Sequence, residues 1–116
     1  MDPRRRFGNR GEELAALLLE RKGYRILERQ WRRVIGEVDL IALDRDELVF
    51  VEVKSRKSSE FGFPEEAVGR KKLHTLQRLV DFYCQEKGWM GKRRIDVVAI
   101  SFGTIPPEIH HLVGVS

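Results

Sequence analysis

The sequence predicts an α/β fold, a central mixed sheet with helices packed on it, in a single domain over residues 1–116. Two observations lead to this prediction. Two long segments place apolar residues at helical spacing, and several shorter segments between and after them are rich in β-branched residues. Their order along the chain is helix, three strands, helix, and then one or two strands. A chain of 116 residues has room for one modest core.

The composition narrows the class of protein. Hydrophobic residues make up 41% of the chain and charged residues 34%, which is typical of a globular domain. The single Cys84 excludes an internal disulfide, and no Cys/His cluster has the spacing of a zinc site. No apolar run reaches membrane-spanning length, and the N-terminal residues lack the apolar core of a signal peptide. We therefore expect a cytoplasmic protein that has no membrane partner.

The first element expected is a helix over residues 9–22, which Gly23 ends. Residues 1–7 before it are basic, and we expect them to form a flexible arm. The middle of the helix is apolar almost all round, which indicates that it is covered on more than one side. Glu12 and Glu13 both fall in its first turn, where the helix dipole favours anions. The residues alone do not decide which of the two has a catalytic role.

The next element is a short strand over residues 24–29. Its alternating pattern places Tyr24, Ile26 and Glu28 on one face. We expect a turn over residues 30–33 between this strand and the following one.

Two apolar, β-branched runs around a four-residue polar connector then form a pattern that is typical of a β-hairpin. The runs are residues 34–43 and 48–54. If Leu43 opposes Leu48, Asp39 lies opposite Glu52, and both carboxylates emerge on one face of the sheet. Directly opposed like charges destabilise a sheet, and a buried carboxylate without a partner is costly. The acid pair therefore predicts a divalent cation, and its hard oxygens suit Mg²⁺ or Mn²⁺.

The same register places Glu37 opposite Lys54, on the face that carries the acid pair. An ammonium group beside a metal-bound pair of carboxylates can stabilise an oxyanion or help to deprotonate a water. A second interpretation stays open from the residues alone. Glu37 and Lys54 then form a plain cross-strand ion pair, and Asp39 is solvated at the end of the sheet. A Glu-x-Lys sequence in a strand does not decide between the two interpretations.

Residues 55–64 form the longest irregular segment. Because this segment directly follows the proposed site, it is either a substrate-contacting flap or a connector pinned by Phe61 and Phe63. A second helix is expected to start at Pro64, and the apolar spacing over residues 70–87 predicts its amphipathic main part.

The C-terminal part predicts a buried strand over residues 95–101 and an edge strand over residues 108–115. Asp96 is unusual inside a buried strand, and we expect it to pair with a nearby arginine. His110 and His111 are adjacent, so in a strand they face opposite sides and make a poor metal pair. We expect both histidines at the surface.

The basic residues occur in clusters, although the net charge is only +4. Most clusters lie next to predicted turns or element ends, where they can follow a phosphate backbone. For any single cluster a solvated surface is the simpler interpretation, and only the combination with the acid pair favours nucleic acid, above all DNA, as a partner. The candidate nucleic-acid-binding residues are Arg32, Arg33, Arg56, Lys57, Lys71 and Lys72.

Several separated motifs occur together in this chain. They are Gly8-x-x-Gly11-Glu12, Gly36-Glu37-Val38-Asp39-Leu40-Ile41, Phe50-Val51-Glu52-Val53-Lys54, Gly62-x-Pro64-Glu65-x-Ala67-Val68, Lys72 and Asp96-Val97-Val98. With these motifs, over about residues 8–100, the chain resembles the YraN family of small uncharacterised proteins. That family belongs to the PD-(D/E)xK nuclease superfamily and is similar to archaeal Holliday junction resolvases. One departure is Gln30, where the family usually has Asn.

The resemblance implies a restriction-endonuclease-like α/β/α fold. It also implies that Asp39 and Glu52 bind Mg²⁺ (or Mn²⁺) with help from the backbone carbonyl of Val53. It selects Glu12 over Glu13 as a supporting acid, since the resolvase-type acid follows a glycine by four residues. Lys54 would orient the attacking water and offset developing charge. The catalytic residues implied are thus Glu12, Asp39, Glu52 and Lys54, and a homodimer is implied because resolvase relatives act as dimers.

These predictions converge on a metal-dependent endonuclease that hydrolyses phosphodiester bonds in DNA and is specific for branched or junction structures. Kinship at the level of the fold does not establish activity. One alternative is a non-catalytic nucleic-acid-binding module, whose affinity falls steeply with salt. Another is an interaction protein that keeps the fold for stability alone.

Overall fold

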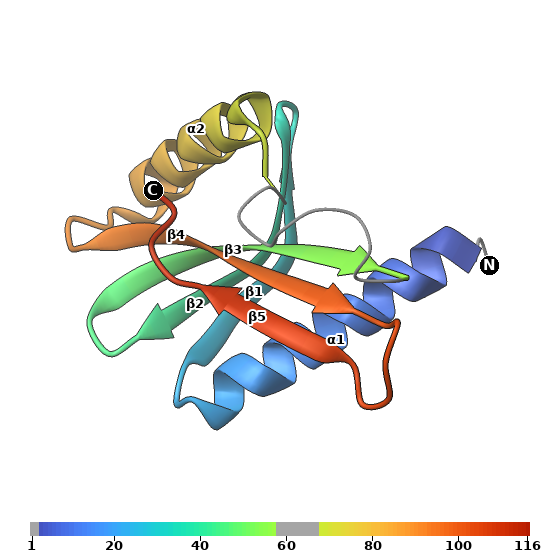
Figure 1. Ribbon diagram of the computed structural model, residues 1–116. Coiled ribbons are helices and arrows are strands. Elements are labelled where there is room, and N and C mark those ends of the chain that lie inside the picture. Colours follow the sequence, from blue (N-terminus) through green and yellow to red (C-terminus); the bar gives the residue numbers. More distant parts are fainter. Residues whose placement is uncertain (1–2, 58–67) are drawn as a thin grey trace.

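The computed structural model describes residues 3–57 and 68–116, with side chains from residue 9 onward. Its elements, in order, are α1 (Pro3–Arg21), β1 (Arg25–Arg33), β2 (Gly36–Asp44), β3 (Glu47–Arg56), α2 (Arg70–Lys87), β4 (Arg93–Ser101) and β5 (Glu108–Leu112). The strands form one sheet in the order β1-β2-β3-β4-β5 (Figure 1). Only β3 and β4 are parallel, so the sheet is mixed. The predicted fold class is confirmed: a central mixed sheet flanked by helices, consistent with a restriction-endonuclease-like α/β/α fold.

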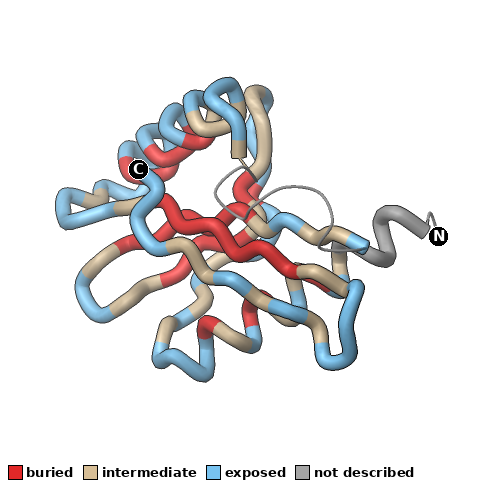
Figure 2. The backbone as a smooth tube through the Cα atoms, in the orientation of Figure 1, coloured by how far each residue is buried: buried red, intermediate tan, exposed pale blue. Residues whose placement is uncertain are grey.

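The two helices cover opposite faces of the sheet, and each builds its own core (Figure 1). On the α2 face, Phe50 of β3 packs in the same cluster as Leu79. On the α1 face, Leu40 of β2 packs in a second cluster with Leu19. β3 and β4 are buried on both faces (Figure 2). This explains why both segments are continuous apolar runs rather than alternating ones.

The hairpin register predicted between β2 and β3 is confirmed over the whole ladder that the two strands form. The ladder extends from Leu40 opposite Val51 down to the turn at residues 45–46. It ends at that first pair, so the predicted Glu37–Lys54 pair does not form in the sheet. Glu37 lies instead opposite Arg32 of β1, with 3.3 Å between its Oε1 and Arg32 Nε.

The alternation of side chains along β2 also changes where the ladder with β3 ends. Ile41 packs on the α2 face and Leu40 on the α1 face, as alternation requires. Strict alternation would place Val38 with Leu40, but Val38 packs with Ile41 on the α2 face. β2 therefore turns away from β3 at Asp39, the residue between Val38 and Leu40.

The first strand differs from its prediction in two ways. The turn predicted over residues 30–33 is wrong, because β1 runs through it and the chain reverses at residues 34–35. A bulge after Ile26 moves Glu28 to the α2 face, where Glu28 Oε2 accepts a hydrogen bond from Tyr83 Oη (3.2 Å). Ile26 packs on the α1 face, so the prediction that it shares a face with Glu28 is also wrong. One extra residue in a strand inverts the alternation beyond it.

α1 is longer than predicted. It starts at Pro3, so most of the segment predicted as an arm before residue 9 belongs to the helix. Proline fits the first helical turn and arginine has a high helix propensity, which favours an earlier start. Within the described part of the chain, no helix is both long enough and apolar enough to span a membrane.

α2 coincides with the predicted amphipathic segment over residues 70–87. It ends at Gly88, whose φ of 66° is a left-handed conformation that suits glycine. The predicted helix start at Pro64, together with Phe61 and Phe63 of the predicted flap, lies outside the described residues.

β4 covers the predicted buried strand, but β5 ends at Leu112 and not at residue 115, and one of the two histidines lies differently from the prediction. Asp96 pairs with Arg94, as expected, with 2.9 Å between Oδ1 and Nε. His110 is exposed, as predicted. The prediction that His111 is a surface group is wrong: its side chain is only 3% exposed, and its Nε2 lies 2.8 Å from Asp96 Oδ2. Adjacent strand residues face opposite sides, so only one of the two histidines can turn inward.

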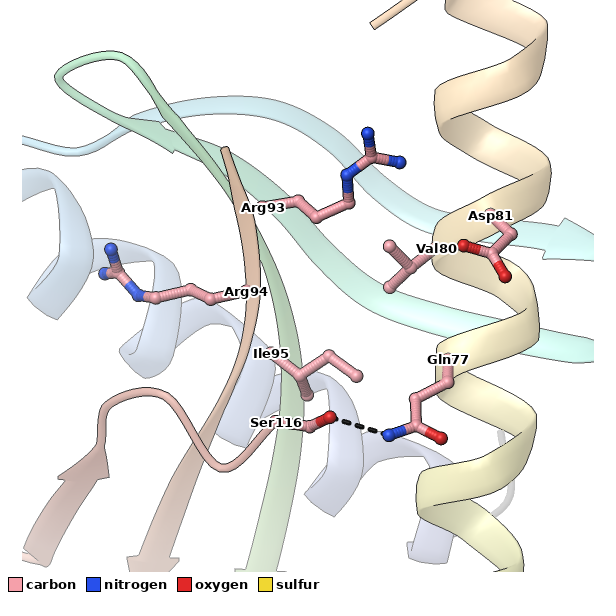
Figure 3. Close-up of a pocket in the computed structure, with 7 residues that line it drawn as sticks. All are labelled: Gln77, Val80, Asp81, Arg93, Arg94, Ile95 and Ser116. Atoms are coloured by element: carbon pink, nitrogen blue, oxygen red, sulfur yellow. Dashed lines mark hydrogen bonds between the residues drawn. The ribbon is translucent and has the colours of Figure 1, made fainter. Parts of the chain in front are cut away.

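A small cavity of about 150 Å³ lies between α2, the start of β4 and the last residue of the chain (Figure 3). Gln77 Nε2 donates to Ser116 Oγ (2.6 Å), and the Ile95 N–H donates to the Ser116 carbonyl (2.9 Å). Arg93 points to the α2 side of β4, whereas Arg94 points away from it (Figure 3). The contacts around this cavity hold the C-terminal residue against the domain.

Candidate active site

Asp39 and Glu52 come together where β2 separates from β3. Asp39 Oδ2 accepts a hydrogen bond from the Val53 N–H at 2.7 Å, so the carboxylate of one strand takes the place of a ladder carbonyl on the other. Glu52 is buried, with only 5% of its surface exposed. The two carboxyl groups are close enough to share a hydrogen bond. The structure thus brings together the two acids that the hairpin register predicted would face each other.

This geometry makes ionisation of both acids costly. Burial raises the pKa of Asp39 well above its usual range, and the neighbouring carboxyl of Glu52 raises it further. The hydrogen bond from the Val53 N–H lowers that pKa, but it does not offset the other two effects. Without a metal ion between them, the two acids therefore hold a proton more tightly than an exposed aspartate does. A cation between the acids would remove this penalty.

Glu12 adds a third acid from α1. Gly11 before it is buried, and a Cβ at that position would collide with the side-chain hydroxyl of Ser55 on β3. Glycine thus allows α1 to approach β3 closely enough for Glu12 to interact with Asp39. Burial raises the pKa of Glu12 to about 7, although a hydrogen bond from Gln30 partly opposes the shift. Glu13 is exposed, so the structure places Glu12, not Glu13, beside the acid pair.

Gln30 is a site residue to which the sequence analysis gave no role. Its Nε2 donates to Glu12 Oε2 at 2.8 Å and to Asn9 Oδ1 at 3.3 Å. Its φ of 49° is left-handed, which is costly for a residue other than glycine. The sequence did carry a signal of this left-handed conformation. The family that the chain resembles usually has Asn at this position, and Asn is the side chain that best tolerates the left-handed region.

Two lysines lie near the acids in different ways. Lys72 of α2 places its Nζ 3.2 Å from Glu52 Oε2. The contact does not have hydrogen-bond geometry, and Glu52 Oε2 has no hydrogen-bond partner among the residues that the structure describes. Lys54 follows Glu52 by two residues on β3 and is exposed. The lysine that touches the acid pair is therefore the one from the helix.

The donors at this position are those of a hard cation. In the described residues, no three or more His, Cys, Asp and Glu side chains are grouped so that they could hold a metal ion. The predicted ligand set needs only two side chains, because the third donor is the Val53 carbonyl. The Val53 N–H points toward β2, and in a strand the carbonyl of the same residue points the same way. Glu52 Oε2, which accepts no hydrogen bond from the described residues, and these oxygens fit Mg²⁺ or Mn²⁺, which keep waters in their remaining positions.

The predicted nucleic-acid-binding residues are not equivalent in the structure. Both Glu86 oxygens lie 2.8 Å from Arg33 Nη2, and the Arg33 guanidinium also lies over the ring of Trp31. Arg32 pairs with Glu37. Lys57 and Lys71 are exposed, at the end of β3 and at the start of α2. Arg56 ends β3, and its carbonyl accepts a hydrogen bond from the backbone N–H of residue 102 (2.8 Å).

Comparison with known proteins assigns most of the chain to one family. The model of a family described as "Uncharacterised protein family UPF0102" matches residues 11–100. Similar relatives include a UPF0102 protein of Arthrobacter sp. (strain FB24), 51% identical over 94% of this chain and 94% of its own. A UPF0102 protein of Moorella thermoacetica is 50% identical over 84% of this chain and 82% of its own. A UPF0102 protein of Cytophaga hutchinsonii is 42% identical over 88% of this chain and 90% of its own.

Proposed function

We propose that this chain is a metal-dependent endonuclease. The chain belongs to the UPF0102 family, which is the YraN family that the sequence predicted. Its reaction would be the hydrolysis of phosphodiester bonds in DNA, with branched or junction DNA as the preferred substrate. The names of the family and its relatives state no activity. The observation that carries the proposal is the pairing of half-buried Asp39 with buried Glu52, in which one Glu52 oxygen has no hydrogen-bond partner among the described residues.

The roles of the residues follow from their positions. Asp39, Glu52 and the Val53 carbonyl would hold Mg²⁺ or Mn²⁺, and the bound ion would lower the pKa of a water and neutralise charge on the scissile phosphate. The Val53 N–H keeps the Asp39 carboxylate aimed into the site. Lys54, exposed at the same end of β3, would orient the attacking water and offset charge on the phosphate oxygens. Glu12 would support the site from α1, held by Gln30.

The surface near the acids can receive a polyanion. Lys57 and Lys71 are exposed. Lys57 follows β3, which carries Glu52, and Lys71 precedes Lys72, whose Nζ lies 3.2 Å from Glu52 Oε2. The chain carries a net charge of +4, which adds attraction that depends on salt. Cutting both strands of a junction requires two active sites, so the junction substrate also requires a homodimer. Light scattering of the purified protein measures that state directly.

The test is Mg²⁺- or Mn²⁺-dependent cleavage of branched, flapped, single-stranded and duplex DNA, with RNA as a comparison. We expect Asp39→Ala, Glu52→Ala and Lys54→Ala each to lose at least about 100-fold in cleavage rate, since each removes charge stabilisation from the site. Glu12→Ala should weaken cleavage, and Glu13→Ala is the matched control that should leave it unchanged.

Failure to cleave any of these substrates with either metal would refute the proposal. Binding to DNA that falls steeply with salt, without cleavage and without change in Asp39→Ala, would instead identify a non-catalytic nucleic-acid-binding module.

A further inference from the structure

We infer that Lys72 is the internal counter-ion of the acid pair, and that a divalent cation must displace its ammonium group from Glu52 in order to bind. The inference rests on the proposed metal site, and it names a residue that determines how tightly that site binds a divalent cation. Lys72 thus acts on the site through the Glu52 carboxylate, for which it competes with the metal.

The contact between Lys72 and Glu52 is close but poorly directed. The Lys72 Nζ lies 3.2 Å from Glu52 Oε2, yet this oxygen has no hydrogen-bond partner among the described residues. The two groups therefore form an ion pair without a directed hydrogen bond. The geometry is that of a nearby charge, which leaves the oxygen open to a better ligand.

The two partners differ in their freedom to move. The Glu52 side chain is 7% exposed, so its carboxylate is fixed in the site. The Lys72 side chain is 41% exposed, so its ammonium can move into water without crossing the core. Displacement therefore requires a change of rotamer in one flexible side chain and no movement of the backbone.

The start of α2 is anchored independently of this contact. Leu73 and Leu76 pack on the α2 core, and the Leu73 N–H donates to the Gly69 carbonyl at 3.0 Å. Release of Lys72 should therefore leave the helix in place. Lys71 is the adjacent residue and is exposed, which makes it a matched control for net charge and helix position.

An ammonium and a divalent ion cannot both occupy the Glu52 oxygen without strong repulsion. Only molecules in which Lys72 has released Glu52 can bind the metal. The apparent affinity for the metal is therefore the intrinsic affinity multiplied by the fraction of such molecules. Removing the ammonium removes the competitor. We expect Lys72→Met to bind Mn²⁺ about 5- to 10-fold more tightly than the wild type, as expected if Lys72 holds Glu52 in most metal-free molecules.

The experiment is calorimetric titration of Mn²⁺ into the full-length wild type, Lys72→Met and Lys71→Met, with thermal unfolding of each protein before and after metal. We expect Lys72→Met to have the lowest Tm without metal, the tightest Mn²⁺ binding and the largest rise in Tm on metal addition. Lys71→Met should match the wild type in Mn²⁺ affinity and in Tm with and without metal. Lys72→Gln is a second neutral variant that should repeat the result, and Lys72→Arg, which keeps the charge, should not.

The outcomes separate this inference from the proposed function. Equal Mn²⁺ affinity in the wild type and both Lys72 variants would overturn the inference and leave the metal site intact. Weaker binding in Lys72→Met would overturn it too, because Lys72 would then assist the metal. Binding by Lys72→Met but not by the wild type would support it in its strongest form. No binding by any of the proteins would refute both the metal site and the inference.

Discussion

Two groups of buried carboxylates lie on the central strands, and they differ in how their charge is compensated. Asp96 on β4 is fully buried, and three groups contact it: Arg94 at 2.9 Å, His111 at 2.8 Å and the Gly114 N–H at 2.9 Å. Burial alone would raise the pKa of Asp96, but the hydrogen bonds from these three groups bring it below its usual value. Asp39 is half-buried, and its pKa is raised.

The partners of Asp96 are themselves satisfied. Arg94 also contacts Glu47 at 2.7 Å, Asp44 at 3.1 Å and Tyr24 Oη at 2.8 Å. His111 Nδ1 lies 2.8 Å from Lys22 Nζ. Because an ammonium can only donate, Nδ1 accepts and Nε2 carries the hydrogen that it donates to Asp96.

The difference separates a structural use of buried charge from a binding use. The Asp96 network is complete, and it joins the C-terminal strands to the end of α1 and the β2–β3 turn. The Asp39–Glu52 pair has like charges and an oxygen with no hydrogen-bond partner in the described part of the chain. A buried network with all its partners stabilises one arrangement, whereas an incomplete one has capacity for a ligand.

The largest effect is expected from breaking the complete network. Asp96→Asn removes the fully buried counter-charge of Arg94, whose side chain is 11% exposed, and leaves beside the guanidinium the carboxylates of Glu47 and Asp44, which are 29% and 32% exposed. We expect a loss of about 3 kcal/mol in the free energy of unfolding, since removing one partner of a buried ion pair is strongly destabilising. Urea denaturation measures the loss. Asp46→Asn in the exposed β2–β3 turn is the matched control and should change stability by less than about 0.5 kcal/mol.

The opposite sign is expected at the acid pair. Asp39→Asn removes one of two repelling acids while its amide oxygen can still accept from Val53. The pKa of Asp39 is raised in the folded state, so between about pH 4 and 8 the unfolded chain loses this proton and the folded protein retains it. The wild type therefore loses stability across this range relative to the variant.

We expect Asp39→Asn to be more stable than the metal-free wild type at pH 8 by about 1–3 kcal/mol, with a smaller difference at pH 5. Denaturation in the presence of a chelator at both pH values measures this difference. A variant that is less stable than the wild type at pH 8 would show that the pair contributes to folding as Asp96 does, and the contrast between the two groups would be lost.

The smallest effect concerns the backbone that holds Glu12. Gln30→Ala and Gln30→Gly both lose the hydrogen bond to Glu12, but only glycine is unstrained at a φ of 49°. We expect the glycine variant to be about 1 kcal/mol more stable than the alanine variant. Gln30→Asn keeps an amide and tolerates the left-handed conformation. Its free energy of unfolding should therefore lie between those of the wild type and Gln30→Gly. Equal stability of the glycine and alanine variants would contradict a strained backbone here.

Much of the site could be predicted because its central pair is close in sequence. Asp39 and Glu52 belong to one hairpin, and the apolar pattern around its short turn determines the register. The same reasoning failed where the pairing ends, since nothing in the alternation reveals that β2 leaves β3 at Asp39. It also failed at the bulge after Ile26, because a single inserted residue leaves no clear mark on so short a pattern.

By itself, the sequence determined the order of helices and strands, the hairpin register and the family of the chain, because these depend on local periodicity and on motifs read in order. Only the tertiary structure decided that Lys72 of α2 contacts Glu52, that Gln30 holds Glu12, and that His111 is buried against Asp96. Each of these contacts joins elements that are far apart along the chain. Their formation depends on how the helices pack on the sheet and on where strands bulge or part, which no local pattern encodes.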